Sequence, residues 1–243
     1  MKNQIIVSLA ILAFGAGCTS AHREKSPAQP AFKSLFNGKD LSNWKGRTNH
    51  WSVEDGCITG TTSKENPAKG NNFLILQQDG TNAMVSDFEA RFSYKFSSDW
   101  GNSGLQYRST AHPNFVVTGY QADFEVGKTY SGILYEEGGR GILAQRGEKV
   151  VIHDDNGQTK KEVVGKVGGS KEIQANIKQG DWNDYVVIVQ GNHIQHFING
   201  MQTVDVTDEQ ESKAAKSGVL AFQIHQGDPM KVQFKNVRIK ERK

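Results

Sequence analysis

The stretch FEARFSYKF (residues 88–96) decides the fold class of this chain. Apolar residues stand at positions 88, 90, 92, 94 and 96, and polar residues stand at the four positions between them. A period of two indicates a β-strand, because successive side chains of a strand point to opposite faces of a sheet. We therefore expect one face of this strand to lie in a core, and the face with Arg91 and Lys95 to lie in solvent.

The same alternation continues along the chain and predicts an all-β protein. It returns in residues 105–108, 120–126, 220–225 and 231–235. Asn199-Gly200 between two apolar segments is the strongest hairpin signal in the sequence. With 26 glycines and 5 prolines, the chain has the composition of many short strands joined by tight turns. This pattern favours a sandwich or jelly roll.

Three further segments carry specific expectations. Residues 171–178 are the one good candidate for a short helix. Residues 185–189 form a continuous apolar run, which predicts a strand covered on both faces. The basic segment 231–243 reads as a solvated edge strand near the C-terminus.

The N-terminus has the features of a secretory signal, which we assign to residues 1–17. Lys2 precedes an uncharged apolar run over residues 5–17, which is shorter than the about 20 residues that a membrane-spanning helix needs. Cys18 ends that run and resembles the lipidated cysteine of bacterial lipoproteins, although Gly15 stands where that motif usually has leucine. The resemblance predicts an exported lipoprotein, periplasmic or at the cell surface, with its anchor in the outer membrane. The alternative is an ordinary signal peptide that happens to contain a cysteine.

Residues 18–31 then form a polar tether that contains Pro27 and Pro30, and residues 32–243 form one domain. Cys57 is the only other cysteine, so the mature chain has no disulfide framework and no zinc site of cysteines. We expect Cys57 to be a small buried apolar residue. The formal net charge of +3 is small and evenly spread, which does not favour a nucleic-acid partner.

A polar set of side chains on neighbouring strands is the candidate site. Gln121, Asp123 and Glu125 share one side of a strand, at spacings of about 6–7 Å per two residues. The pairs Gln106/Arg108 and Gln223/His225 repeat the pattern on two other segments. If these strands are neighbours, the set offers carboxylates, amides, an imidazole and a guanidinium, which together can donate and accept hydrogen bonds. The alternative is an ordinary solvated sheet face.

Seven short motifs follow one another along the chain: Leu35–Trp44 (LFNGKDLSNW), Trp51–Gly56 (WSVEDG), Asn102–Gly104 (NSG), Gly119–Asp123 (GYQAD), Gly180–Asn183 (GDWN), His196–Gly200 (HFING) and Phe234–Ile239 (FKNVRI). In this order they resemble the bacterial 3-keto-disaccharide hydrolase family, and the resemblance covers essentially residues 32–241. The resemblance implies a concanavalin A-like jelly roll of two antiparallel sheets, to which the candidate segment 171–178 adds one short helix. It also implies an exported enzyme that cleaves the glycosidic bond of 3-keto-glycosides.

The implied chemistry is an elimination followed by addition of water. A ketone at C3 acidifies the hydrogen on C2, so a base can remove it while an acid assists departure of the group at C1. Asp123, Glu125 and His225 are the catalytic candidates, with no roles assigned among them, and Gln106, Arg108, Gln121 and Gln223 are the substrate-binding candidates. Arg108 could stabilise the enolate oxygen. The three catalytic candidates could equally hold a divalent metal that polarises the ketone.

Three other classes of function remain open. A retaining glycosidase would use two carboxyl groups about 5–5.5 Å apart on an unoxidised glycoside. A glycan-binding module would line its groove with tryptophan or tyrosine. A structural surface protein would have no polar cluster. Convergence of Arg108, Asp123, Glu125 and His225 in one pocket is the geometry expected of catalysis.

Overall fold

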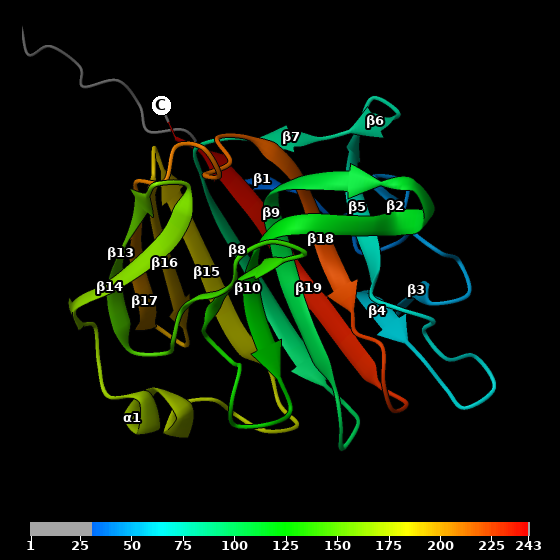
Figure 1. Cartoon of the computed structure of the whole chain (residues 1–243). Coiled ribbons are helices and arrows are strands. Elements are labelled where there is room, and N and C mark those ends of the chain that lie inside the picture. Colours follow the sequence, from blue (N-terminus) through cyan, green and yellow to red (C-terminus); the bar gives the residue numbers. More distant parts are fainter. Residues whose placement is uncertain (1–30, 243) are drawn as a thin grey trace, which may run out of the picture.

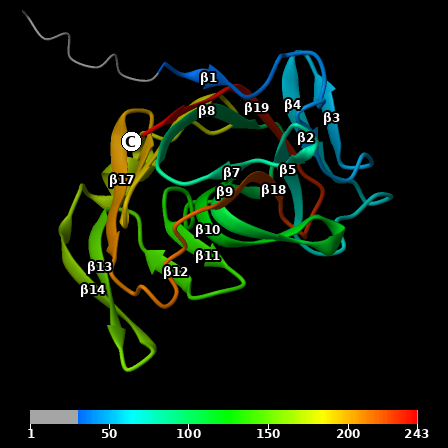
Figure 2. The same cartoon turned by 90° about the horizontal axis from the view of Figure 1, so that it is seen from above.

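The computed structural model describes residues 31–242 and shows two β-sheets packed face to face (Figures 1 and 2). In chain order the elements are β1 (Lys33–Ser34), β2 (Trp44–Lys45), β3 (Trp51–Glu54), β4 (Cys57–Thr61), β5 (Asn72–Gln78), β6 (Thr81–Asn82), β7 (Met84–Val85), β8 (Phe88–Phe96), β9 (Asn102–His112), the 3₁₀ turn η1 (Pro113–Phe115), β10 (Val116–Glu125), β11 (Leu134–Glu137), β12 (Gly141–Ala144), β13 (Glu148–Asp155), β14 (Gln158–Lys166), α1 (Ser170–Ala175), β15 (Asn183–Gln190), β16 (His193–Ile198), β17 (Met201–Asp208), β18 (Gly218–Ile224) and β19 (Lys231–Glu241).

The larger sheet has ten strands in the order β14-β13-β17-β16-β15-β8-β19-β4-β3, with β1 beside β19. The smaller sheet has nine, in the order β12-β11-β10-β9-β18-β5-β2, with β6 beside β5 and β7 beside β18. The pairings are antiparallel except for β13 and β17, which run parallel. The all-β sandwich and its one short helix are confirmed. No helix within residues 31–242 is long and apolar enough to cross a membrane.

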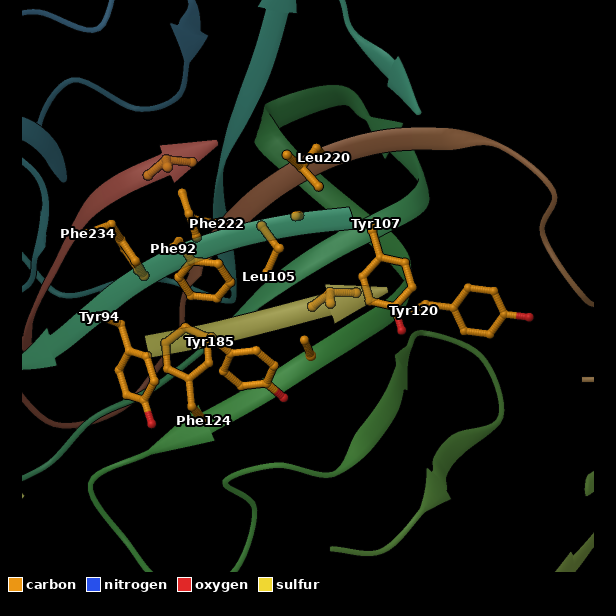
Figure 3. Packing of buried hydrophobic residues seen from close by; sticks show 14 of the residues in the cluster. Phe92, Tyr94, Leu105, Tyr107, Tyr120, Phe124, Tyr185, Leu220, Phe222 and Phe234 are labelled. Carbon is orange, nitrogen blue, oxygen red and sulfur yellow. The ribbon is translucent and has the colours of Figure 1, made fainter. Parts of the chain in front are cut away.

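Interlocked aromatic rings from both sheets fill the space between them (Figure 3). Phe222 of the smaller sheet stacks on Phe234 of the larger one at 3.9 Å between ring centroids. Tyr94 and Phe124 pair across the sheets in the same way at 4.2 Å. The apolar positions of residues 88–96 are all buried in this core, as their alternation predicts.

Several local expectations are confirmed. Asn199 and Gly200 adopt positive φ angles of 49° and 81° in the tight turn between β16 and β17, the conformation that favours an Asn-Gly pair. The helix lies at residues 170–175 and overlaps the expected segment 171–178. Cys57 is buried and has no disulfide partner among the described residues.

Two expectations about strand environment are wrong. β19 is not an edge strand, because it pairs with β8 on one side and β4 on the other. Its apolar side chains complete the core, and its basic ones point outward. β15 is not covered on both faces, although its continuous apolar run predicts this. Val186 and Ile188 are only partly buried, because they lie on the uncovered outer face of the larger sheet.

The hairpin of β9 and β10 is sharply bent and covers part of the smaller sheet. The register shifts between Thr118 and Tyr120, where Arg108 (φ 47°) and Gly119 (φ 139°) leave the extended conformation. Beyond this bulge the hairpin crosses β18 and β5 (Figure 1). There the apolar residues of the hairpin pack on the outer face of the sheet and form a second, smaller cluster with residues of β5 and β18. Its buried members are Phe73, Ile75, Val117, Val219 and Ala221, and Ala111 and Phe115 pack against them.

The bend depends on glycine at position 119. An alanine methyl there would lie 2.6–2.9 Å from atoms of Ser109, whereas a methyl at Gly80, also at positive φ (75°), would meet nothing within 4 Å. We expect Gly119→Ala to lower the free energy of unfolding by about 3 kcal/mol, since left-handed strain and overlap add. Gly80→Ala should cost only the strain, about 1 kcal/mol. Urea unfolding of both variants measures this, and equal losses would contradict the steric argument.

Candidate functional site

Four of the predicted residues lie together on the outer face of the smaller sheet, because β10, β9 and β18 are adjacent in it. The amides of Gln106 and Gln121 are 2.8 Å apart. Gln121 donates to Asp123 Oδ2 at 3.0 Å and contacts Gln223 at 3.4 Å. All four side chains are buried. We call this set, Gln106, Gln121, Asp123 and Gln223, the polar floor.

Hydrogen bonds extend the polar floor in two directions. At one end, Asn102 donates to Asp123 Oδ1 at 3.1 Å. At the other, Gln223 donates to Glu137 Oε2 at 3.3 Å, and Asn71 donates to Glu137 Oε1 at 3.1 Å. A continuous set of side-chain contacts therefore connects two carboxyl groups, those of Asp123 and Glu137.

Sequence reasoning missed Glu137, and the reason is local. Glu137 comes directly after Glu136 at the end of a four-residue strand. Such a strand is too short for alternation to show which of the two glutamates points toward the site. The structure separates them. Glu136 is buried against Arg140, whose Nε donates to Glu136 Oε2 at 2.8 Å, whereas Glu137 joins the polar floor.

Asp123 is the electrostatically unusual member of the site. Burial raises the pKa of its carboxyl from 3.8 to about 8, against the opposing effect of the amide hydrogen bonds from Gln121 and Asn102. The charges of Glu125 and Glu137 raise it further. Asp123 therefore retains its proton at neutral pH and can donate it. Nearby, burial first and then the charges of Glu137 and Asp123 raise the pKa of the Tyr135 phenol.

Two open hollows flank the polar floor. The first, of about 670 Å³, we call the Glu137 hollow; Arg47, Asn71 and Gln226 also line it, and Asn114 of the bent hairpin forms part of its wall. The second, of about 400 Å³, we call the Trp100 hollow. Its lining includes Trp100, Asn102, Glu125, Tyr130 and His225. Asn102 links this hollow to Asp123.

Glu125 and His225 therefore lie together, but in the Trp100 hollow rather than within the polar floor. Glu125 Oε1 accepts the backbone N–H groups of Thr129 at 2.6 Å and Tyr130 at 2.8 Å, which fixes the loop after β10. His225 follows the last residue of β18, and its ring centroid lies 6.2 Å from that of Trp100.

Arg108 does not converge with the other predicted residues. The alternation of β9 places it beside Gln106, but its positive φ at the bulge turns the side chain elsewhere. Its guanidinium donates to the carbonyl oxygens of Ser86 and Gly191, each at 2.7 Å, and to Asp87 Oδ1 at 2.6 Å. Arg108 thereby connects the segment before β8 with the turn between β15 and β16, away from the polar floor.

Other predicted features are placed as follows. Within residues 31–242, no three His, Cys, Asp or Glu side chains gather in a group that could hold a metal ion. Cys18, the signal segment 1–17 and the tether up to residue 30 lie outside the described residues.

Solved structures define the class of fold. The chain resembles a protein from Parabacteroides distasonis to which glycosyl hydrolase activity is ascribed, at a TM-score of 0.53 and 21% identity over 87% of this chain and 94% of that one. A Bacillus subtilis protein of unknown function with a galectin-like fold matches at a TM-score of 0.55 and 10% identity, over 87% and 94%. The carbohydrate-binding module CBM66 of Bacillus subtilis matches at 0.52 and 13%, over 83% and 97%. At these identities the likeness establishes the jelly-roll fold.

The family is established by sequence. The profile of the 3-keto-alpha-glucoside-1,2-lyase-like domain matches residues 31–240, and the chain belongs to this family. It is therefore a carbohydrate-active protein. No curated protein sequence matches the chain closely.

The raised pKa of Asp123 predicts a pH dependence of stability. The unfolded chain loses this proton near pH 3.8 and the folded chain near pH 8, so the folded state binds more protons between these values. The free energy of unfolding should then fall as pH rises from 4 to 8, by up to about 1.4 kcal/mol per pH unit. Urea titrations at a series of pH values should show that Asp123→Asn removes this slope, whereas Asp99→Asn, at an exposed position, retains it. An unchanged slope in Asp123→Asn would contradict the assignment.

Proposed function

We propose that this chain cleaves 3-keto-glucosides by elimination across C1 and C2, followed by addition of water. The observation that carries the proposal is a pair of carboxyl groups that hydrogen bonds of the polar floor connect and that have different surroundings. Asp123 is buried and protonated at neutral pH, and Glu137 lines an open hollow. A buried carboxyl group that keeps its proton and a second carboxyl group at an open hollow can supply the acid and the base that this chemistry requires.

The ketone makes the first step feasible. A carbonyl at C3 acidifies the C2 hydrogen, and the carboxylate of Glu137 accepts that proton. The C2–H electron pair forms the C1=C2 double bond as the C1–O bond breaks. The departing oxygen takes the proton from Asp123, which leaves an enone and a free alcohol.

Water then completes a net hydrolysis. Its oxygen adds to C1 and a proton returns to C2, so no oxidant or reductant is consumed. The family description, a 1,2-lyase acting on 3-keto-alpha-glucosides, supports the elimination half of this sequence. Asn102 and Gln121 donate to the two oxygens of the Asp123 carboxyl, which fixes the orientation of this group.

The Trp100 hollow suits the leaving group. It adjoins Asp123 through Asn102 and offers the apolar faces of Trp100 and Tyr130 together with the polar groups of His225 and Glu125. Sugar rings and aromatic alcohols both pack on such aromatic faces. His225 is thereby a binding group for the departing half of the substrate.

Incubation with a 3-keto-glucoside and with its parent glucoside tests the activity. We expect alcohol release from the keto form only, and a decrease of about 10²–10⁴-fold in kcat for Asp123→Asn and for Glu137→Gln. Glu162→Gln, an exposed carboxylate on β14, is the matched control and should retain full activity. Release from the parent glucoside would instead identify an ordinary glycosidase.

A glycan-binding module is the second candidate function. The aromatic lining of the Trp100 hollow is the feature expected of it, and the similarly folded CBM66 is a carbohydrate-binding module. In the same assay this alternative predicts saturable glycan binding with no release from either substrate.

We further propose that the protein is exported and anchored by a lipid on Cys18. The support is the order of Lys2, an uncharged apolar run and the cysteine at its end. Cells fed labelled palmitate should incorporate the label into the full chain and into Cys57→Ser, but not into Cys18→Ser. Label that persists in Cys18→Ser would exclude this anchor.

A further inference from the structure

The expectation of evenly spread charge is wrong for the folded chain. Positive charge is concentrated on the outer face of the larger sheet, on the opposite side of the sandwich from the polar floor. Six basic side chains lie on the adjacent strands β8 and β19 or directly after β19. They make up what we call the cationic face: Arg91, Lys95, Lys235, Arg238, Lys240 and Arg242. Two carboxylates, Glu89 and Asp184, lie among them. The net charge of this face thus exceeds the +3 of the whole sequence.

A bulge in β19 brings these charges to one side. Lys235 and Arg238 are three residues apart, so strict alternation would place them on opposite faces of the sheet. The register shifts between them, where Asn236 has a φ of 57°. Lys235 then lies opposite Ser93 and Arg238 opposite Arg91, with both side chains outward.

Two aromatic rings lie among the charges. Arg91, Arg238 and Lys240 surround the ring of Phe32, at 4.9, 5.3 and 5.0 Å from its centroid. Lys95 and Lys235 lie over Trp182, at 5.1 and 4.0 Å. Contact with a ring face positions a cation but leaves its charge available to an anion outside the protein.

The acidic partners on this face neutralise little of the charge. Glu89 is buried and shared, accepting from Arg91 Nε at 2.7 Å and lying 2.9 Å from Lys240 Nζ. Asp184 accepts the hydroxyl of Ser93 at 2.6 Å. Lys95, Lys235 and Arg238 have no salt bridge to a carboxylate within residues 31–242.

We propose that the cationic face docks on an anionic lipid headgroup layer. Basic side chains interspersed with aromatic rings are the composition of surfaces that bind the interface of acidic membranes. The start of the described chain supports this occupant, since Phe32 lies on this face and β1 pairs with β19. Cys18 is 13 residues before Ala31, a segment that spans at most about 45 Å even when extended.

This inference uses the proposed lipid on Cys18 to explain why the face meets a membrane, but the face itself is independent of both the anchor and the activity. Its test therefore uses a chain without lipid. The described strands of both sheets lie between residues 33 and 241, so the chain from residue 19 onward contains every strand that the structure describes. Weak electrostatic binding remains measurable at low ionic strength, where the Debye length is about 10 Å or more.

Sedimentation with vesicles decides the question. We expect the unlipidated chain to bind phosphatidylethanolamine vesicles that contain phosphatidylglycerol, and to bind neutral vesicles of phosphatidylethanolamine and phosphatidylcholine at least about tenfold more weakly. The binding should disappear near 1 M salt, where the Debye length is about 3 Å. The double variant Lys235→Gln/Arg238→Gln should lose about tenfold or more in affinity.

The double variant Lys160→Gln/Lys166→Gln removes the same charge from exposed positions of β14, at the far edge of the same sheet, and is the matched control. It should bind like the unaltered chain. Unfolding midpoints establish that both variants fold. Equal binding to anionic and neutral vesicles, equal loss in the two variants, or self-association through this face without vesicle binding would overturn the proposal, whatever the result of the 3-keto-glucoside assay.

Discussion

The arrangement of the site depends on the bulge between β9 and β10, where Arg108 and Gly119 lie at positive φ angles. A hairpin without it would continue straight along the sheet. With it, the distal part of β9 and β10 folds over β18 and β5, and Asn114 becomes part of the wall of the Glu137 hollow. The guanidinium of Arg108 holds the outside of the bend through Ser86, Gly191 and Asp87, so the bend is stabilised by charge-assisted hydrogen bonds.

Burial of the polar floor costs folding free energy, which the rest of the sandwich offsets. Buried amides and a buried carboxyl are tolerable only when they satisfy one another, as Gln106, Gln121, Asp123 and Gln223 do. The interlocked aromatic core between the sheets supplies the apolar burial that offsets this cost. A carboxyl that stays protonated at neutral pH is the chemical product of the arrangement, because its burial disfavours the charged form.

The two sheets present opposite chemistry to solvent. The outer face of the smaller sheet holds carboxyl groups and amides beside two hollows. The outer face of the larger sheet holds six basic side chains, five of which lie over two aromatic rings. In the proposed orientation the cationic face meets the membrane and the hollows open away from it, where a diffusing glycoside has free access. Substrate cleavage and membrane contact then use different strands and do not compete for the same residues.

The sequence by itself determined the class of fold, the core positions of strands such as residues 88–96, the Asn199-Gly200 turn and the family, because these follow from local periodicity, turn conformation and ordered motifs. It also identified Gln106, Gln121, Asp123 and Gln223 as members of one polar face. Only the tertiary structure placed Arg108 outside that face, Glu137 within it and β19 inside its sheet. Each of those outcomes depends on a bulge or on which strands are neighbours. A single bulge changes the face of the sheet to which all later side chains of that strand point. Strand order is set by contacts between segments far apart in the chain.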